Sequence, residues 1–308
     1  MPSNKIVMCG CHIAGIEAIK YILDHGIIID YFVILTPQQA IEYHISGYFD
    51  YTAMANDYNI PIYYAKSYNL KADEDLAFFR KNHFDLMIQG GWQRLFPDEV
   101  LTTLRVGAIG LHGSSDFLPR GRGRSPYNWS LIEGKKRFIL HFFLIKPGID
   151  DGDIFHYEHF EINDFDDINT MYYKGAILTK RAYVQFIPKL LNGEIALMEQ
   201  KGQATYYPKR TPEDGKIDWN NMDVDQIYNF IRAQTKPYPG AFTSFNESPI
   251  YLWKAQVFDR VIKYDDARYG EVVEIFDDYN LLINCLGGLL LVTFYDSSEK
   301  IVIGSVFA

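Results

Sequence analysis

Short apolar runs alternate with segments of helical spacing over the first third of the chain. Buried strands are predicted at 5–9, 31–35, 60–64 and 84–88. Helices are predicted between them at 13–23, 51–59 and 76–82, the first ending near Gly26. Because strands that alternate with helices form parallel sheets with right-handed crossovers, this pattern indicates a Rossmann-like α/β domain.

The predicted strands place several turns at one edge of the sheet. The turns at Gly10, Thr36, Gly90 and His112 each follow an apolar run. In parallel sheets the carboxyl ends of the strands meet at one edge, and ligands bind in the crevice outside it. We therefore expect the functional site at this edge.

The character of the chain changes near Tyr206. Residues 206–240 read as a proline-rich linker followed by a helix at 224–233, with Asp223 as a possible cap. Residues 241–308 contain short apolar runs separated by turn residues, which is typical of a small β-barrel-like domain. The expected organisation is an α/β domain over 1–205, a linker with a helix over 206–240, and an all-β domain over 241–308.

Composition narrows the class of protein. With 308 residues, 48% apolar and 22% charged, the chain is an ordinary globular protein of about two domains. No apolar run approaches the roughly 20 residues of a membrane span, and the N-terminus runs directly into a strand-like segment. We expect no membrane span, no cleavable signal peptide and a cytoplasmic location. The net charge of −9 argues against nucleic-acid binding, which depends on clustered Lys and Arg.

The cysteines and the first turn exclude other kinds of site. Cys9, Cys11 and Cys285 form neither a disulfide framework nor a zinc set, so two small buried thiols are expected at Cys9-Gly10-Cys11 and no metal. This turn also lacks the G-x-G-x-x-G fingerprint of dinucleotide-binding proteins. His12, at the start of the next helix, is either a loop histidine with a local hydrogen bond or a contact for an anion.

The stretch from Ile109 to Asp153 carries the candidate chemistry. His112 leaves an apolar segment, a loop containing three arginines follows, and Gly148–Asp153 forms a carboxylate turn. Such a segment can set an imidazole beside an aspartate with cationic groups around them, which suits acyl transfer to a nitrogen. The arginines either grip a phosphate or carboxylate through bidentate hydrogen bonds or belong to a solvated loop paired with nearby acids.

The same residues resemble the folate-dependent formyltransferases. The family carries an Asn-x-His element, a Leu-Pro-x-x-Arg-Gly loop and a Gly-x-Asp-x-Gly-Asp turn, which correspond here to 110–112, 118–123 and 148–153. Segments 90–97, 211–219 and 231–240 resemble further elements of the family in the correct order. The family includes methionyl-tRNA, glycinamide ribonucleotide and amino-sugar formyltransferases, the last acting in surface-glycan synthesis. Residues 122–129 look closest to the amino-sugar branch.

The resemblance implies an activity and a set of site residues. It implies transfer of a formyl group to the amine of a nucleotide-linked amino sugar. The cosubstrate would be 10-formyltetrahydrofolate, and the protein could form a homodimer. His112 would be the catalytic base or donor, oriented by Asp150. Folate-binding residues are predicted at Gly91, Trp92, Phe96, Pro97, Leu118 and Asp153. Substrate-binding residues are predicted at Arg120, Arg122, Arg124 and Asn128.

The sequence departs from the family at Gly110, which replaces the usual Asn, and by two extra residues between His112 and Leu118. That Asn helps to hold the oxyanion, and losing one such donor typically costs about 10²–10³ in rate. Another donor then substitutes, with Ser114, Ser115 and Asn128 as candidates, or activity is weak. If the donor is missing, Gly110→Asn should raise turnover; if the loop at 114–116 has taken over its role, the added amide should crowd the site and lower turnover. Alternatives are a methionyl-tRNA formyltransferase, which the acidic balance disfavours, and a pseudoenzyme that binds folate or a nucleotide sugar.

Overall fold

The computed structural model describes residues 4–308 and divides the chain into two compact units. The first unit contains the chain up to Arg122, Ile139–His159 and Tyr173–Thr205. The second contains Gly123–Phe138, Phe160–Tyr172 and Tyr206–Ala308. Residues 1–3, which begin the segment used for the signal-peptide expectation, lie outside the described residues. The expected boundaries at 205 and 240 remain predictions, because this division follows contacts rather than chain order.

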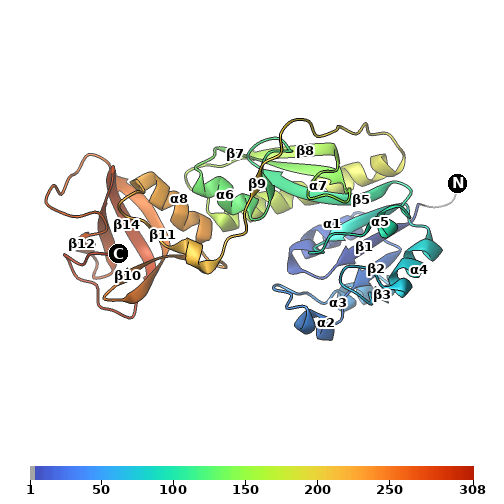
Figure 1. Cartoon of the computed structure of the whole chain (residues 1–308), viewed down its shortest axis with the longest axis horizontal. Coiled ribbons are helices and arrows are strands. Elements are labelled where there is room, and N and C mark those ends of the chain that lie inside the picture. The colour runs from blue at the N-terminus through green and yellow to red at the C-terminus, as the bar shows by residue number, and fades with distance from the viewer. Residues whose placement is uncertain (1–3) are drawn as a thin grey trace. The chain divides into compact units, whose positions relative to one another are not determined.

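A seven-stranded sheet in the order β3-β2-β1-β4-β5-β7-β8 organises the first part of the chain (Figure 1). Its strands are β1 (Ile6–Gly10), β2 (Tyr31–Ile34), β3 (Ile62–Tyr64), β4 (Leu86–Gly90), β5 (Gly107–Ser114), β7 (Arg137–Leu144) and β8 (Asp153–Glu161). Strands β1 to β5 run parallel to one another, and β7 runs antiparallel to β5. The predicted α/β class is confirmed, and the parallel strands end together at the expected edge.

Helices join these strands where the apolar spacing predicts them. A 3₁₀ turn at Ile13–Gly15 leads into α1 (Ile16–Asp24), and α3 (Thr52–Asp57) and α4 (Asp73–Asn82) fall within or beside predicted helices. Helix α2 (Pro37–Glu42), α5 (Asp98–Leu101) and α7 (Ile168–Leu191) were not predicted. The sequence does contain a signal for the start of α2. Thr36 and Gln39 form a reciprocal capping box, and Pro37 between them occupies the first turn. None of the described helices is long and apolar enough to cross a membrane.

The core of the first unit fixes the turns at the carboxyl edge. Cys9 and Cys11 are buried free thiols, as predicted. Tyr51 is completely buried, and its hydroxyl donates to the carbonyls of His12 and Gly90, each 3.1 Å away. This hydroxyl therefore ties together the turns after β1 and β4. The His12 ring accepts a local hydrogen bond from the Ala14 amide, which is the local contact expected of a loop histidine.

The second unit contains a five-stranded antiparallel sheet in the order β10-β11-β14-β13-β12. The strands are β10 (Ala241–Phe245), β11 (Ser248–Asp259), β12 (Val272–Phe276), β13 (Asn280–Cys285) and β14 (Gly288–Asp296). The last residues join the outer strands: Ala308 exchanges hydrogen bonds with Ser244 beside β10, and Ser305 accepts from Val272 of β12. Hydrogen bonding thus closes the sheet, in agreement with the predicted barrel-like domain.

Two helices accompany this barrel within the second unit. Helix α8 (Val224–Gln234) begins at Asp223, whose carboxylate accepts from the Gln226 amide in a capping box. Its buried face packs on the barrel core around Trp219. Helix α6 (Pro126–Ile132) packs on α8, and Asn128 donates to the Ala233 carbonyl at 2.8 Å. Short strands β6 (Arg122–Gly123) and β9 (Tyr206–Tyr207) pair with each other.

Candidate active site

The candidate site is built around His112 on β5. This strand pairs with β4 on one side and β7 on the other, so His112 is held by backbone hydrogen bonds at the carboxyl edge. Its side chain is 8% exposed. Side chains alternate between the faces of a strand, so Gly110 and Ser114 share the face of His112. Residues directly opposite on an antiparallel neighbour share that face as well, and these include Phe143 and His141 of β7.

Asp150 lies against one nitrogen of the His112 ring. Its carboxylate oxygen is 3.3 Å from Nδ1, and the other ring nitrogen, Nε2, is 2.8 Å from the Gly121 carbonyl oxygen. Both neighbours are acceptors, so an imidazole with protons on both nitrogens can donate to both. The structure therefore brings the two predicted catalytic residues together, with an imidazole oriented as a proton donor.

The arginine-containing loop is fastened beside His112 by residues from later in the chain. Thr205 Oγ1 accepts from the Gly121 amide at 2.8 Å, and the Thr205 carbonyl accepts from the Arg122 amide at 3.0 Å. Ser114 Oγ donates to the Arg120 carbonyl at 2.9 Å. The loop is thus held on both sides of the carbonyl that His112 contacts. Thr205 lies in no motif of the sequence, and its role depends on tertiary packing.

Sequence reasoning also missed His141, which lies directly opposite His112 on β7. It is completely buried, and burial lowers its pKa to about 4. Its Nε2 accepts from the Leu118 amide at 3.4 Å, so its single proton resides on Nδ1, which has no hydrogen-bond partner. His141 is therefore a neutral ring that connects β7 to the start of the loop. No motif in the sequence marks His141, and its position opposite His112 becomes apparent only from the strand pairing.

The space beside Gly110 is filled by β7. A β-carbon at Gly110 would lie 2.5 Å from the Phe143 ring and 2.8 Å from Ile145 Cγ1. Phe143 is buried with Leu118 and Ile154 in a small apolar cluster. An Asn at position 110 therefore requires Phe143 to move. Of the two outcomes expected for Gly110→Asn, a rise in turnover or a crowded site with lower turnover, this geometry favours crowding, because there is no vacant space for the amide.

The candidate replacements for that amide are engaged elsewhere. The Ser114 hydroxyl donates to Arg120, and the Asn128 amide nitrogen donates to Ala233 within the second unit. Ser115 is buried. The structure thus gives no support to Ser114 or Asn128 as a donor to an oxyanion at His112.

Of the predicted folate residues, those in segment 91–97 follow β4 at the carboxyl edge, and most of the predicted set have buried side chains. Trp92 and Phe96 are 2% and 4% exposed, and their rings stack in the core of the first unit. Gly91, Pro97, Leu118 and Asp153 complete the predicted set. Asp153 begins β8 and pairs with Lys146 at 2.8 Å. The exposed residues of segment 91–97 are Gln93, Arg94 and Leu95.

The predicted substrate residues are divided between the two units. Arg120 is exposed, whereas Arg122 is partly buried and both Nε and Nη2 donate to Gln200 Oε1. Arg124 and Asn128 belong to the second unit. Asn128 lines a cavity of about 100 Å³ there with Arg210 and Gln234, and its Oδ1 has no partner. Their use as substrate ligands therefore remains a prediction.

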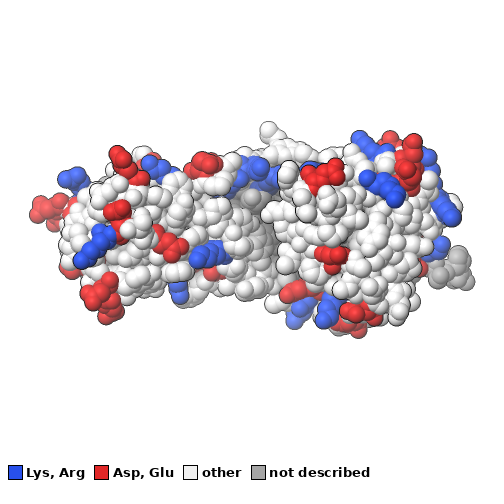
Figure 2. Space-filling view, turned by 90° about the horizontal axis from the view of Figure 1, so that it is seen from below, with Lys and Arg blue, Asp and Glu red and all other residues white. Residues whose placement is uncertain are grey.

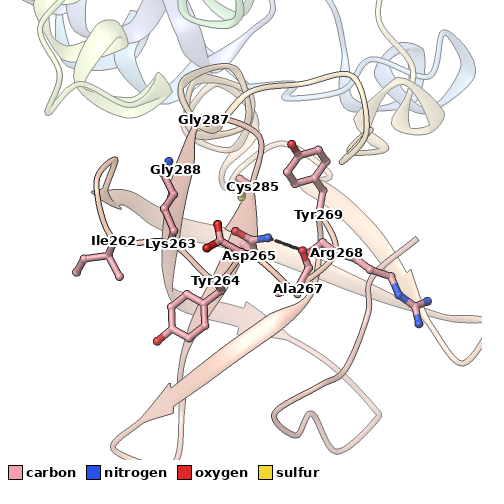
Figure 3. Close-up of a pocket in the computed structure, with 11 residues that line it drawn as sticks. Ile262, Lys263, Tyr264, Asp265, Ala267, Arg268, Tyr269, Cys285, Gly287 and Gly288 are labelled. Carbon is pink, nitrogen blue, oxygen red and sulfur yellow. Dashed lines mark hydrogen bonds between the residues drawn. The ribbon is translucent and has the colours of Figure 1, made fainter.

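A larger cavity in the second unit lies between the loop at 262–269 and the turn between β13 and β14. It has a volume of about 330 Å³ and is lined by Lys263, Tyr264, Asp265 and Arg268 among others (Figure 3). Asn284 donates to the Ala267 carbonyl at its wall, as the dashed line shows. The cavity has charged groups of both signs, and no residue with candidate chemistry lines it. Among residues 4–308, no cluster of three or more His, Cys, Asp or Glu could hold a metal ion.

Comparison with known proteins defines the class of this fold and site. Residues 51–187 match the family model described as formyl transferase, and residues 209–305 match the formyl transferase C-terminal domain. The chain is 31% identical over 234 residues to methionyl-tRNA formyltransferase of Ruminiclostridium cellulolyticum, covering 75% of this chain and 73% of that protein. The chain belongs to the formyltransferase family.

Other relatives extend the comparison. The chain is 28% identical over 257 residues to the bifunctional polymyxin resistance protein ArnA of Wigglesworthia glossinidia brevipalpis, covering 82% of this chain but 38% of that protein. An N-formyltransferase from Helicobacter canadensis, solved with folinic acid and dTDP-3-aminofucose, has a TM-score of 0.68 at 15% identity, covering 94% of this chain and 99% of that one. The sugar 3N-formyltransferase WlaRD has a TM-score of 0.65 at 16% identity, covering 94% and 97%. These structures share the fold of this chain.

Proposed function

We propose that the protein transfers a formyl group from 10-formyltetrahydrofolate to the amine of a nucleotide-linked amino sugar. The observation that carries the proposal is the His112–Asp150 pair at the carboxyl edge of the sheet, in a chain of the formyltransferase family. The amine attacks the formyl carbon and forms a tetrahedral oxyanion. Collapse then breaks the bond to N10 of the folate, which takes up a proton while the new amide loses one.

His112 is the residue placed to move these protons. Its Nε2 donates to the Gly121 carbonyl in the structure, and exchange of that carbonyl for a reacting atom would turn Nε2–H toward the oxyanion or the departing N10. After giving up its proton, the ring can accept the one that the attacking amine loses. The Asp150 carboxylate orients the ring through Nδ1 and stabilises its protonated form.

The folate cosubstrate is proposed on two grounds. Solved structures with the same fold contain folinic acid, 5-N-formyl-THF or tetrahydrofolic acid. The predicted folate segment, residues 91–97, follows β4 at the edge that also carries His112. Because Trp92 and Phe96 are buried in the core, we propose that the exposed residues 93–95 of this segment contact the folate and that the two rings support them.

A nucleotide-linked amino sugar is the acceptor that the charge distribution favours. Residues 241–308 contain ten acidic and five basic residues, and the chain carries a net charge of −9. On the face shown in Figure 2 basic and acidic side chains are interspersed. A tRNA acceptor would require a basic surface to neutralise phosphates, whereas a nucleotide diphosphate needs only a few cations, such as the exposed Arg120.

Mass spectrometry after incubation with 10-formyltetrahydrofolate and a panel of nucleotide-linked amino sugars tests the proposal. A gain of one formyl group on one acceptor is expected. Two relatives at 31% identity are methionyl-tRNA formyltransferases, so initiator methionyl-tRNA belongs in the same panel. Binding of folate and a nucleotide sugar without turnover would instead support the pseudoenzyme, for which the apolar filling beside Gly110 is the motivating observation.

A further inference from the structure

Gln200 joins the arginine-containing loop to the carboxylate turn. It lies between α7 and β9, outside every motif that the sequence singled out. Its Nε2 donates to the carbonyls of Asp150 and Gly152, each at 2.8 Å. Its Oε1 accepts from Arg122, with 2.6 Å to Nη2 and 3.2 Å to Nε. The two donor hydrogens and the acceptor oxygen of one amide are all engaged.

One of the two carbonyls that Gln200 holds belongs to Asp150, which faces His112, and the other belongs to Gly152, two residues further along the turn. Asp150 adopts a positive φ of 51°, which is uncommon for a non-glycine residue and requires support from its surroundings. On the other side of the turn, Gly152 packs so closely on the Leu144 carbonyl that a β-carbon would collide with it. The turn is thus fixed against β7 at Gly152 and against Gln200 at two peptide groups.

The segment that carries Gln200 is itself anchored on both sides. Met198 exchanges two backbone hydrogen bonds of 2.8 Å with Ile154 at the start of β8. Thr205 holds the loop beside His112 through Pro119, Gly121 and Arg122. Gln200 lies between these two anchored residues, so its backbone is held in place and its side-chain amide can fix the Asp150 turn.

We propose that Gln200 is a positioning residue for the His112–Asp150 pair and that Arg122 acts through it. This inference rests on the proposed formyl transfer. Arg122 orients the Gln200 amide, the amide fixes the peptide groups that follow Asp150 and Gly152, and Asp150 orients the His112 ring. Arg122 thereby has a role in holding the turn that differs from its predicted contact with substrate.

Gln200→Glu tests the proposal most directly. It keeps the size of the side chain and its contact with Arg122 but removes both N–H donors to the carbonyls of the turn. Two carboxylate oxygens then face the carbonyls of Asp150 and Gly152. We expect kcat to fall about 10- to 100-fold with KM within about threefold, since a displacement of about 1 Å in a catalytic group has effects of this size. Gln203→Glu, an exposed change of the same kind in the same segment, is the matched control.

Hydrogen exchange supplies a readout that does not depend on activity. Amides of 148–153 should exchange faster in Gln200→Glu than in the wild type, and Gln203→Glu should leave them unchanged. Unaltered kcat, or unaltered exchange in this turn, would overturn the proposal. A wild type that transfers no formyl group to any acceptor would remove the proposed function, whereas the exchange experiment would still show whether Gln200 holds the turn.

Substitution of Arg122 distinguishes a positioning role from direct substrate binding. If it acts through Gln200, Arg122→Ala should lower kcat with little change in KM for the acceptor and should increase exchange in 148–153. A rise in KM with kcat and exchange unchanged would mean that Arg122 binds substrate directly, and would contradict its part in the proposal.

Discussion

Single residues at the carboxyl edge decide what chemistry the fold can support. His112 contributes a ring with both nitrogens engaged, by Asp150 on one side and the Gly121 carbonyl on the other. Phe143 fills the place where the family's usual Asn would extend from position 110. The oriented imidazole favours proton transfer and therefore a fast formyl transfer. The apolar wall at the place of the usual Asn removes a donor to the oxyanion and therefore favours a slow one.

Substitution of the catalytic pair tests the role of the imidazole. His112→Ala should nearly abolish formyl transfer while leaving the fold intact. Asp150→Asn should lower kcat by about 10²-fold or more, because the neutral amide no longer stabilises the protonated ring. Circular dichroism and steady-state kinetics measure both effects. Near-normal turnover in either folded variant would show that another group moves the proton.

At Gly110 the structure favours one of the two expected outcomes of a substitution. Gly110→Asn should destabilise the protein by about 1–3 kcal/mol and lower turnover, since its β-carbon meets the Phe143 ring. Combining it with Phe143→Ala provides room for the amide, and turnover should then exceed that of Phe143→Ala alone. Urea unfolding and kinetics on the three variants check this. A fully stable, faster Gly110→Asn single variant would show that Phe143 yields easily.

At the scale of elements, the pairing of β5 with β7 brings together residues that are distant in the sequence. The pairing sets His141 opposite His112 and Phe143 opposite Gly110. The loop between these strands returns beside His112 because the His141 ring accepts from Leu118 and Thr205 accepts from Gly121. The site therefore depends on the register of one antiparallel pair as much as on the parallel sheet.

The buried His141 makes stability depend on pH. Burial lowers its pKa to about 4, whereas an unfolded histidine titrates near 6.5. Between these values the unfolded state binds the extra proton, so the free energy of unfolding is complete above about pH 6.5 and falls as the pH drops toward 4. The loss should reach about 3 kcal/mol. Urea unfolding across this range measures it.

His141→Gln provides the comparison for this pH dependence, because glutamine retains an acceptor for the Leu118 amide but does not titrate. The slope between pH 6.5 and 4 should become shallower in this variant. His159→Gln removes an exposed histidine of β8 and serves as the control. Equal slopes in the wild type and His141→Gln would show that His141 remains accessible to protons in the folded state.

At the scale of the whole molecule, the proposed acceptor is argued from the distribution of charge. The barrel of the second unit is acidic, with ten acidic and five basic residues between 241 and 308. Phosphate binding by a basic surface releases counterions and gives a steep dependence on salt. An acidic barrel lacks the charge for this effect, although the chain shares its C-terminal family domain with methionyl-tRNA formyltransferases.

Binding measurements at physiological salt test the acceptor ranking. The protein should bind a nucleotide-linked amino sugar with a micromolar dissociation constant and should show negligible affinity for initiator tRNA. Fluorescence titration with both ligands at two salt concentrations is sufficient. A tight, salt-sensitive tRNA complex would reverse the ranking and favour the methionyl-tRNA alternative.

The sequence by itself determined the α/β class, the barrel-like C-terminal part and the placement of His112 beside Asp150. These follow from local apolar periodicity and from motifs whose order along the chain is preserved. The helix α7 was missed, because its polar and apolar positions give no clear stripe. The buried thiols at Cys9 and Cys11 were predicted because short apolar segments bury small side chains.

Only the tertiary structure decided how the site is supported. Gln200, Thr205 and His141 belong to no motif, and they reach the site through long-range strand pairing and loop packing. The filling of the space beside Gly110 by Phe143 was likewise invisible, because it depends on the register of β7 against β5. Local periodicity reports which face of an element is buried, whereas the neighbours of a side chain are fixed by contacts between distant segments.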